Sequence, residues 1–417
     1  MSKKNSNILA IVIMFFLFAM ISFVTGLQNP MGIIAKAQFE ATNAMSQLGN
    51  LANFIAYAFL GLPAGMLLKK KGYKFTALAA VSVGFVGVLI SYISGIVGSF
   101  EVYLLGAFVS GFSMCMLNTV VNPMLNTLGG GGNKGNQLIQ YGGALNSLAA
   151  TIVPYLCGML IGEVTEKTQV ADVNLVLFIA MGVFALAFVV LIFSQIPEPE
   201  LEAAKASKAQ EEGMVDSIKG AVSHKNLVFG IIAIFLYVGI EVGIPNIANL
   251  YMTDVNGLNI AAGVAGGLVA IYWLLMLCGR LLGGIIGGKV SSRTMMIAVC
   301  SVAIVFILAG MFMPSTWTMN IMGTDIPVGI LFFILCGLCT SVMWGSIFNL
   351  AVEGLGKYTS IASGLFMVMV CGGGVLPVIQ GAVADAAGYM QSYWVLIAAL
   401  AYILWFALLG SKVKSSK

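Results

Sequence analysis

Charged residues are scarce in this sequence: Asp, Glu, Lys and Arg together make up 9% of its 417 residues. Soluble globular proteins carry roughly a quarter charged residues, which they need to cover a water-facing surface. Hydrophobic residues account for 59%, so the polar material for such a surface is absent. The composition therefore excludes a soluble protein and indicates a polytopic membrane protein whose solvent is lipid.

Histidine is nearly absent, and the cysteines have no reactive setting. The one histidine, His224, falls in a polar stretch, which excludes a histidine relay or zinc site within the membrane. The seven cysteines lie inside apolar runs, where a thiol behaves as a small hydrophobe. A redox or metal role for the C-x-x-C pair Cys336 and Cys339 would require accessible thiolates. We expect no metal and no cofactor, and we find no nucleophile with a base that would indicate an enzyme.

Long gaps between charged residues predict the membrane spans, because a charge at mid-bilayer is costly and about 20 apolar residues are needed to cross. Twelve such gaps occur, six on each side of a polar stretch, and only Glu241 and Arg280 lie inside them. The gaps run between residues 4 and 36, 40 and 69, 74 and 101, 101 and 134, 134 and 163, 172 and 198, 225 and 254, 254 and 289, 293 and 325, 325 and 353, 357 and 385, and 385 and 412.

The distribution of lysine and arginine predicts the orientation. Of the 20 basic residues, Arg280 lies in a span, Lys36 and Lys167 fall on the outer side, and the other 17 fall on the side that holds both termini. Positively charged loops stay in the cytoplasm, so we expect both termini there and a multi-pass location in the cell (inner) membrane. The net charge of +4 then reflects topology and not nucleic-acid binding. The first apolar run is too long for a signal peptide and is interpreted as a retained helix.

Two sets of six spans predict an all-α protein made of two six-helix bundles. We expect bundles at residues 1–195 and 226–417, joined by a cytoplasmic linker at 196–225 that forms a surface helix. Two half-bundles around a midplane cavity are typical of alternating-access transporters, in which one half rocks against the other. This two-half architecture works as a monomer, so a monomer is what we expect.

Polar residues inside the spans mark candidate substrate contacts, because they are expensive in lipid. Asn118, Asn122 and Asn126 recur every four residues and so share one helical face. Their amides both donate and accept hydrogen bonds, which suits a ligand rich in hydroxyl groups. Amides that bind helices to one another are an equally good explanation for any one of them. The candidate substrate-binding residues are Asn118, Asn122, Asn146, Asn246, Asn249, Trp273, Arg280, Asn349 and Gln380.

Glu241 and Arg280 are the two charges within spans. Pro245 leaves the backbone carbonyl of Glu241 without its usual amide donor. An arginine keeps its charge, so Arg280 requires a cavity, an acid or an anionic ligand. The two residues are either a coupling switch or a static ion pair. Trp273, two turns before Arg280, is a candidate for stacking on a sugar or for plain packing.

Four lysines, Lys69, Lys70, Lys71 and Lys74, join the second and third spans. Their first role is a topology signal, and their second is a gating loop on the cytoplasmic side.

Several segments resemble the major facilitator superfamily and, within it, the fucose permease-like sugar:cation symporter family. The tenth- and eleventh-span segments are the more specific, while the lysine loop indicates only the superfamily. The segments are GLPAGMLLKKKGYK (61–74), NTVVNPMLNTLG (118–129), FLYVGIEVG (235–243), CGRLLGG (278–284), MWGSIFNLAVEGLGKYTSIASGL (343–365) and GGGVLPVIQGAVADAAG (372–388).

The resemblance implies sugar uptake by alternating access, commonly driven by a proton. Three departures from the family affect its polar residues. The proton-carrying acid of the fourth span is replaced by Asn118, and FVTGLQNP (23–30) holds no acid where the fucose permease has one. A glutamine common in the fifth span falls near Gly143, although Asn146 is kept. Proton coupling in the manner of the fucose permease therefore loses its acids in the N-terminal half.

The leading hypothesis is a secondary active transporter for a monosaccharide or an amino or acidic sugar, coupled to a proton or sodium ion. One alternative is a permease for an anionic sugar, a sialic acid or uronate, with Arg280 as the carboxylate clamp. A drug or metabolite exporter is another, although it would favour an apolar, aromatic cavity. A membrane sensor that moves nothing is the fourth, and the short sequence after the last span argues against it.

Overall fold

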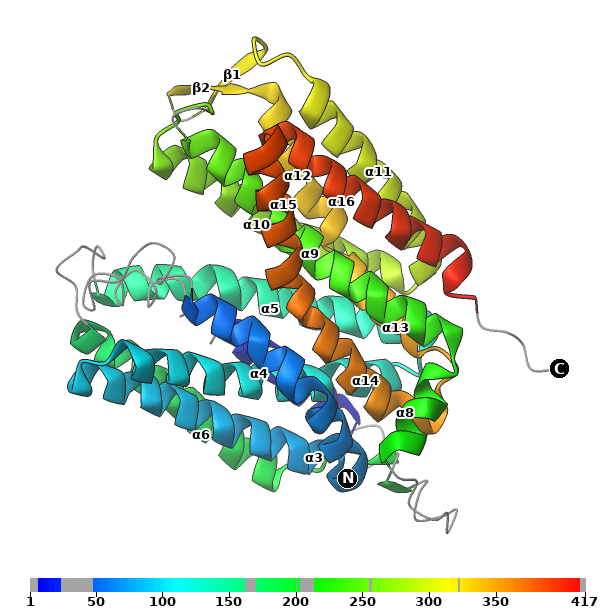
Figure 1. Ribbon diagram of the computed structural model, residues 1–417. Coiled ribbons are helices and arrows are strands. Elements are labelled where there is room, and N and C mark those ends of the chain that lie inside the picture. The colour runs from blue at the N-terminus through cyan, green and yellow to red at the C-terminus, as the bar shows by residue number, and fades with distance from the viewer. Residues whose placement is uncertain are drawn as a thin grey trace. The chain divides into compact units, whose positions relative to one another are not determined.

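The computed structural model describes residues 7–23, 48–161, 170–199, 201–202, 214–254, 257–321 and 323–412 (Figure 1). Regular structure in these ranges is helical apart from one hairpin, in which β1 (Thr318–Ile321) pairs antiparallel with β2 (Thr324–Pro327). Within the predicted linker 196–225, residues 200 and 203–213 lie outside the described residues, as does FVTGLQNP beyond residue 23. The elements keep the labels of Figure 1.

Helix α3 (Leu48–Val97) joins the second and third predicted spans without a loop. Its 50 residues would extend about 75 Å at 1.5 Å per residue, more than twice the thickness of a bilayer core. Gly72 interrupts it with φ 84°, a left-handed conformation that glycine adopts at no steric cost. The predicted join at Lys69–Lys74 is therefore a sharp kink at Gly72 between two helical segments, with the lysines on either side of it.

Nine described helices are long and apolar enough to cross a membrane. The second half of α3, the shorter helix Asn7–Phe23 and α5 bring this number to the twelve predicted spans. The other α-helices with bounds in the described residues are α4 (Phe100–Leu128), α5 (Gly132–Ile161), α6 (Asn174–Phe193), α8 (Met214–Val222), α9 (Lys225–Thr253), α10 (Ala262–Gly287), α11 (Ser292–Phe312), α12 (Val328–Thr340), α13 (Met343–Val352), α14 (Thr359–Val368), α15 (Gly372–Ala387) and α16 (Tyr389–Trp405).

Two predicted spans are each built from two shorter helices. The tenth span consists of α12 and α13, which are separated by Ser341 and Val342. The eleventh consists of α14 and α15, with a 3-10 turn at Met369–Cys371 between them. Breaks of this kind expose backbone carbonyls inside a membrane protein, where side chains of neighbouring helices satisfy them.

The chain forms two compact units. Unit 1 consists of residues 1–128, 145–223 and 355–368, and unit 2 of residues 129–144, 224–354 and 369–417. Unit 1 is drawn mostly from the N-terminal half of the sequence but includes 355–368. Unit 2 is drawn mostly from the C-terminal half but includes 129–144. The predicted bundle boundaries at residues 195 and 226 stay a prediction.

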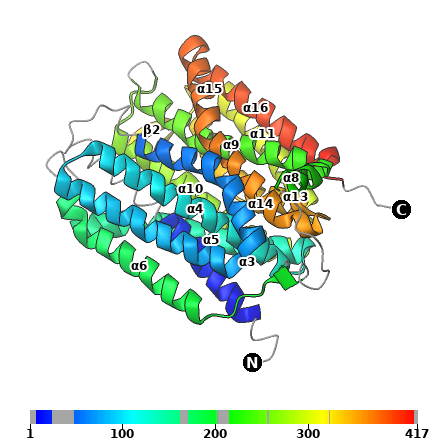
Figure 2. The same cartoon turned by 60° about the horizontal axis from the view of Figure 1, so that its bottom comes forward.

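In unit 1, helices α3, α4 and α6 lie side by side (Figure 2). Small residues allow the close approach of α3 and α4, since a Cβ on Gly87 would lie 2.5 Å from Ser110 Oγ and one on Gly106 would lie 2.5 Å from Ser91 Oγ. Helix α14 also packs on α3, where a Cβ on Gly65 would lie 2.8 Å from Gly364 Cα.

In unit 2, α9 is the central helix and packs against α10, α12, α13, α15 and α16. The hairpin β1–β2 follows the end of α11 (Figure 1). The first part of α5, up to Ala144, belongs to this unit. Unit 2 therefore contains Glu241 on α9, Arg280 on α10 and the backbone of α5 near Gly143.

Candidate coupling and sugar site

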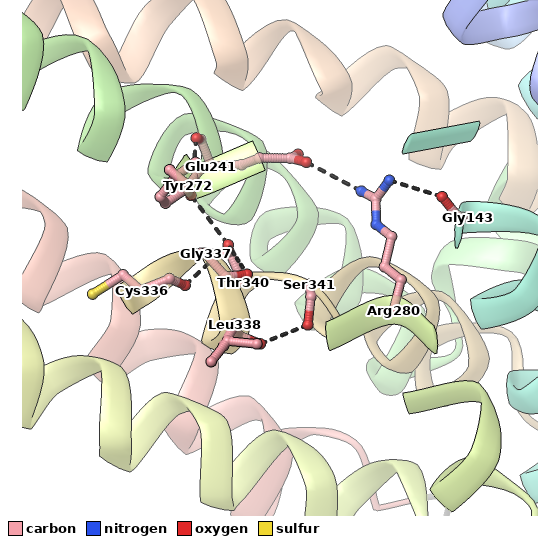
Figure 3. Close-up of polar contacts among 9 residues, drawn as sticks. All are labelled: Gly143, Glu241, Tyr272, Arg280, Cys336, Gly337, Leu338, Thr340 and Ser341. Carbon is pink, nitrogen blue, oxygen red and sulfur yellow. Dashed lines mark hydrogen bonds and ion pairs between the residues drawn. The ribbon is translucent and has the colours of Figure 1, made fainter. Parts of the chain in front are cut away.

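Glu241 and Arg280 form an ion pair within unit 2 (Figure 3). Arg280 Nη2 donates to Glu241 Oε1 at 3.2 Å, and the two side chains are only 12% and 15% exposed. Arg280 Nη1 also donates to the backbone carbonyl of Gly143 on α5 at 3.1 Å. The guanidinium therefore bridges the carboxylate of α9 and a carbonyl of α5, so the two charges that the sequence marked as candidate partners are in contact.

The backbone at Glu241 is held by a second contact, which follows from Pro245. Pro245 has no N–H to donate to the carbonyl of Glu241 four residues earlier. The Tyr272 hydroxyl of α10 donates to this carbonyl instead, at 3.2 Å. The same hydroxyl lies 3.1 Å from Thr340 Oγ1 at the end of α12. Tyr272 thus connects three helices at the level of Glu241 (Figure 3).

Two aromatic side chains near this site differ in exposure. Tyr237, one turn before Glu241, is fully buried and meets Trp344 edge-on at 6.3 Å between ring centroids. Trp273 is 39% exposed and lies edge-on to Tyr272 at 5.3 Å. Of the two, only Trp273 presents a ring to its surroundings, as stacking on a sugar requires.

Amides at the start of α5 bind neighbouring helices of unit 2. Gln137 Nε2 donates to the carbonyl of Gly284 on α10 at 2.9 Å. Gln140 Nε2 donates to the carbonyl of Val342, in the break between α12 and α13, at 2.9 Å. With Gly143 as the acceptor for Arg280, positions 137, 140 and 143 form one stripe of contacts along α5.

The asparagine stripe of α4 is a hydrogen-bonded network in unit 1. Asn118 Nδ2 donates to Tyr57 Oη at 3.0 Å and to the carbonyl of Met114 at 3.2 Å. Asn122 Nδ2 donates to the carbonyl of Asn118 at 2.9 Å. The predicted shared face is consistent with these contacts, and the donors of both amides are used within the protein.

Two further predicted residues also bind protein groups. Asn146 Nδ2 donates to the carbonyl of Phe18 at 2.9 Å, which ties α5 to the helix Asn7–Phe23 in unit 1. Asn349 Nδ2 donates to Ser292 Oγ at 2.9 Å, which ties α13 to α11 in unit 2. Their role as sugar contacts stays a prediction.

The amides predicted as sugar contacts on α9 and α15 make no side-chain hydrogen bonds to described protein groups. Asn246 is exposed, and Asn249 is partly exposed with a buried Oδ1 that has no hydrogen-bond partner. Gln380 is fully buried, and neither of its amide atoms has a partner in the part of the chain that the structure describes.

Lys74 and Glu198 exchange helix caps in unit 1. Glu198 accepts the backbone N–H groups of Tyr73 and Lys74 at 2.7 and 2.8 Å, where the helix restarts after Gly72. Lys74 Nζ donates to the carbonyls of Ile192 and Ser194 at the end of α6, both at 2.8 Å. Each charge thus complements a helix dipole. Burial raises the pKa of the Glu198 carboxyl, and these N–H bonds oppose that shift.

The other three lysines of the predicted gating segment differ from Lys74. Lys69 Nζ donates to Ser217 Oγ of α8. Lys70 and Lys71 are exposed, and Lys71 lies 6.0 Å from the ring centroid of Phe75. A gating role for the four lysines stays a prediction.

Several contributing residues escaped the sequence analysis. Tyr272 and Glu198 were not identified, although Pro245 predicted the free carbonyl that Tyr272 binds. Asn226 was also missed; its Nδ2 donates to the carbonyls of Ala351 and Glu353 at 3.0 and 2.9 Å and so caps α13. Within the described ranges, no three His, Cys, Asp or Glu side chains gather in a way that could hold a metal ion.

The sequence matches a family of membrane transporters over most of its length. The model of the Major Facilitator Superfamily matches residues 11–377. A glucose/galactose transporter of Brucella abortus is 29% identical over 420 residues, covering 99% of this chain and 96% of the relative. A putative glucose/galactose transporter of Helicobacter pylori is 28% identical over 425 residues, covering 98% of each. The L-fucose-proton symporter of Escherichia coli is 22% identical over 401 residues, covering 90% and 88%.

Solved structures confirm the fold. The E. coli fucose:proton symporter has a TM-score of 0.83 at 20% identity, covering 98% of this chain and all of that one. A proton:xylose symporter has a TM-score of 0.74 at 12% identity, covering 98% of each chain. The predicted all-α fold of twelve spanning helices is confirmed, as is the resemblance to the fucose permease-like transporters. The matched proteins are transporters, so the prediction that the chain is not an enzyme is confirmed as well.

Proposed function

We propose that this chain, which belongs to the Major Facilitator Superfamily and is a multi-pass membrane protein, takes up a neutral monosaccharide together with a cation. Relatives that match over nearly the whole chain are named glucose/galactose transporters, and a more distant one is named an L-fucose-proton symporter. These names support a neutral hexose as substrate and a proton as the first candidate for the driving ion. Sodium is the second candidate.

The observation that supports coupling is the ion pair between Glu241 and Arg280. Two positions where the fucose permease family has an acid, at Asn118 and within FVTGLQNP, hold none in this chain. Glu241 is the acid deep within a span, and its counterion also contacts α5 through Gly143. Binding of a proton or sodium ion at Glu241 would weaken its hold on Arg280 and thus the connection between α9, α10 and α5. We assign these two residues the charge switch.

The ion pair also favours a neutral substrate over an anionic one. Arg280 already has a carboxylate partner and a carbonyl acceptor, so a sugar carboxylate would have to displace Glu241. Removal of one partner from a buried pair costs about 3–5 kcal/mol. The anionic-sugar permease, with Arg280 as its clamp, is therefore the second candidate and an outcome of the test below.

We assign sugar contacts to side chains whose polar or aromatic groups are not already bound by other groups of the protein. Asn246, Asn249 and Trp273 present polar or aromatic groups that the described structure leaves accessible or unsatisfied. The donors of Asn118, Asn122, Asn146 and Asn349 are bound, and these residues serve a sugar only through their carbonyl oxygens or after a change of state.

The cycle is alternating access of a monomer in the cell (inner) membrane, with both termini in the cytoplasm. The bundles 1–195 and 226–417 move against each other, with 196–225 as the linker. Lys69, Lys70, Lys71 and Lys74 then lie on the cytoplasmic side. This orientation is supported by the distribution of basic residues.

Uptake by purified protein in proteoliposomes tests the substrate. Labelled D-glucose, D-galactose and L-fucose are compared with N-acetylhexosamines, uronates and a sialic acid, each with empty liposomes as the control. The proposal expects uptake of a neutral hexose that is competed by unlabelled neutral hexoses. Uptake of an acidic sugar alone would replace it with the anionic-sugar permease, and uptake of none would contradict sugar transport.

A further inference from the structure

Helices α9 and α15 meet along a seam with no room for side chains, and they run side by side (Figure 1). A Cβ on Gly372 would lie 2.1 Å from the carbonyl oxygen of Phe235, and one on Gly239 would lie 2.3 Å from the Cβ of Leu376. Glycines at such positions let helix backbones approach closely in a membrane. The contacts advance by four residues on both helices, so the two helices run parallel.

Gln380 is the polar residue at the next level of this seam. A Cβ on Gly243, four residues after Gly239, would lie 2.5 Å from Gln380 Oε1. Gln380 is 0% exposed, and neither Nε2 nor Oε1 has a hydrogen-bond partner in the described part of the chain. The amide is therefore sealed between α9 and α15 and is aimed at the backbone of α9.

This placement is costly for the fold. A buried polar group that lacks a hydrogen bond is destabilising, and Gln380 has two such groups. Native proteins leave few polar groups in this condition. A methionine would fill the same length without the penalty. The amide lowers the stability of the described state, so its benefit has to arise in another state.

Both helices contain a proline close to Gln380. Pro377 lies three residues before it on α15, and Pro245 lies two residues after Gly243 on α9. Proline removes a backbone hydrogen bond and is the commonest cause of sharp bends in helices. Each helix therefore lacks one helical hydrogen bond close to the level where the amide is enclosed, which is where proline favours a bend.

Unsatisfied polar atoms continue along α9 from this level. Asn246 lies one turn beyond Gly243 and is exposed, and Asn249 follows one turn later with a buried, unpartnered Oδ1. Residues three positions apart on a helix are neighbours on its surface. The end of the seam thus collects amides that the protein itself does not satisfy.

We propose that Gln380 is a sugar subsite that α9 covers in the state described here and that opens when α15 bends away from α9. Its amide offers a donor and an acceptor to two neighbouring hydroxyl groups of a neutral monosaccharide. A bound sugar forms the hydrogen bonds that the Gln380 amide lacks while α9 and α15 are in contact. Sugar binding therefore favours the state in which the two helices are apart. This assignment rests on the proposed function, because it requires that the protein bind a sugar.

Substitution of Gln380 by methionine tests the subsite. The apolar side chain removes two buried unsatisfied groups, so we expect the melting temperature of Q380M without sugar to equal or exceed that of the wild type. We expect its KM for the transported sugar to rise about tenfold, as the loss of one hydrogen bond of about 1.4 kcal/mol predicts. L376M, one turn earlier in the same seam, is the matched control and should leave KM unchanged, because it exchanges one apolar side chain for another.

Deoxy sugars show whether the amide contacts the ligand directly. Analogues of the transported sugar that each lack one hydroxyl are compared in wild type and in Q380M. In the wild type, the analogue that lacks a hydroxyl bound by Gln380 should bind about tenfold more weakly, and in Q380M the same deletion should have little further effect. The other deletions should weaken both proteins equally.

Two results would overturn the assignment while leaving sugar transport intact. The first is a Q380M protein with wild-type KM and a wild-type response to every deoxy sugar. The second is a fall in the melting temperature of Q380M without sugar, which would show that the amide is satisfied within the fold. A wild-type protein that transports no sugar would instead overturn the proposed function and this assignment together.

Discussion

The Tyr272 hydroxyl lies 3.2 Å from the backbone carbonyl oxygen of Glu241 and donates a hydrogen bond to it. Pro245 leaves this carbonyl without a helical donor, so one side chain of α10 repairs a break in α9. The side chain of Glu241 is bound by Arg280, eight residues further along α10. One helix therefore holds both the backbone and the charge of the proposed coupling acid.

Replacement of Tyr272 by phenylalanine should destabilise the protein by about 1–3 kcal/mol, because it leaves the partly buried carbonyl of Glu241 without a donor. The melting temperature in detergent measures the loss. Y92F is the control: Tyr92 is partly exposed and packs on Phe178 at 5.1 Å between centroids, so we expect little change. Equal melting temperatures for Y272F and wild type would show that the carbonyl does not depend on Tyr272.

Arg280→Gln should be strongly destabilising, because it leaves the carboxylate of Glu241 buried without its counterion, at a cost of about 3–5 kcal/mol. The double variant E241Q/R280Q should recover most of this stability, since no unpaired charge remains. A double-mutant cycle of melting temperatures checks the coupling. R293Q is the control, since Arg293 donates to the neutral Ser411 hydroxyl and should show a small effect. Additive single effects in the cycle would contradict a functional ion pair.

Glu198→Ala should lower stability by about 1–2 kcal/mol, because the N–H groups of Tyr73 and Lys74 lose their acceptor after the kink at Gly72. The exposed Glu202, four residues later, provides the matched control, and E202A should have little effect. Thermal unfolding of the two variants side by side measures the difference. Equal losses would show that the cap on the restarted helix contributes nothing.

Gly364→Val should reduce transport more than tenfold, because α14 packs on α3 with no space for a side chain at this position. A Cβ on Gly364 would lie 2.6 Å from the carbonyl oxygen of Gly61. The control is Gly182→Ala on α6, where an added Cβ would meet no atom within 4 Å. Initial uptake rates at equal protein content provide the comparison, and wild-type uptake by G364V would show that this contact is dispensable.

The uncharged runs between charged residues predicted the spans well. A charge inside the bilayer is costly, so few other placements of twelve spans on this sequence are possible. The gap between Glu40 and Lys69 and that between Lys74 and Glu101 became the two halves of α3. The continuous helix across Lys69–Lys71 was not predictable, since a short basic segment marks a loop in most membrane proteins and only the φ angle of Gly72 shows the kink.

Polar partners were much harder to predict than polar positions. The period of four along α4 placed Asn118 and Asn122 on one face, but not the Tyr57 hydroxyl that binds Asn118. Glu241 and Arg280 were recognised as a candidate pair, because each charge in a span requires a partner. Nothing local in the sequence identifies Tyr272 or Gly143, because those contacts depend on how helices far apart in the chain pack together.

The coupling of ion and sugar movement at Glu241 is the central claim, and galactose accumulation in proteoliposomes tests it most directly. The wild type should concentrate labelled galactose inside the vesicles when an inward proton or sodium gradient is imposed. E241Q should exchange labelled for unlabelled galactose at a similar rate without any gradient, yet fail to concentrate it with either one. Accumulation by E241Q equal to that of the wild type would contradict the assignment of Glu241 as the coupling acid.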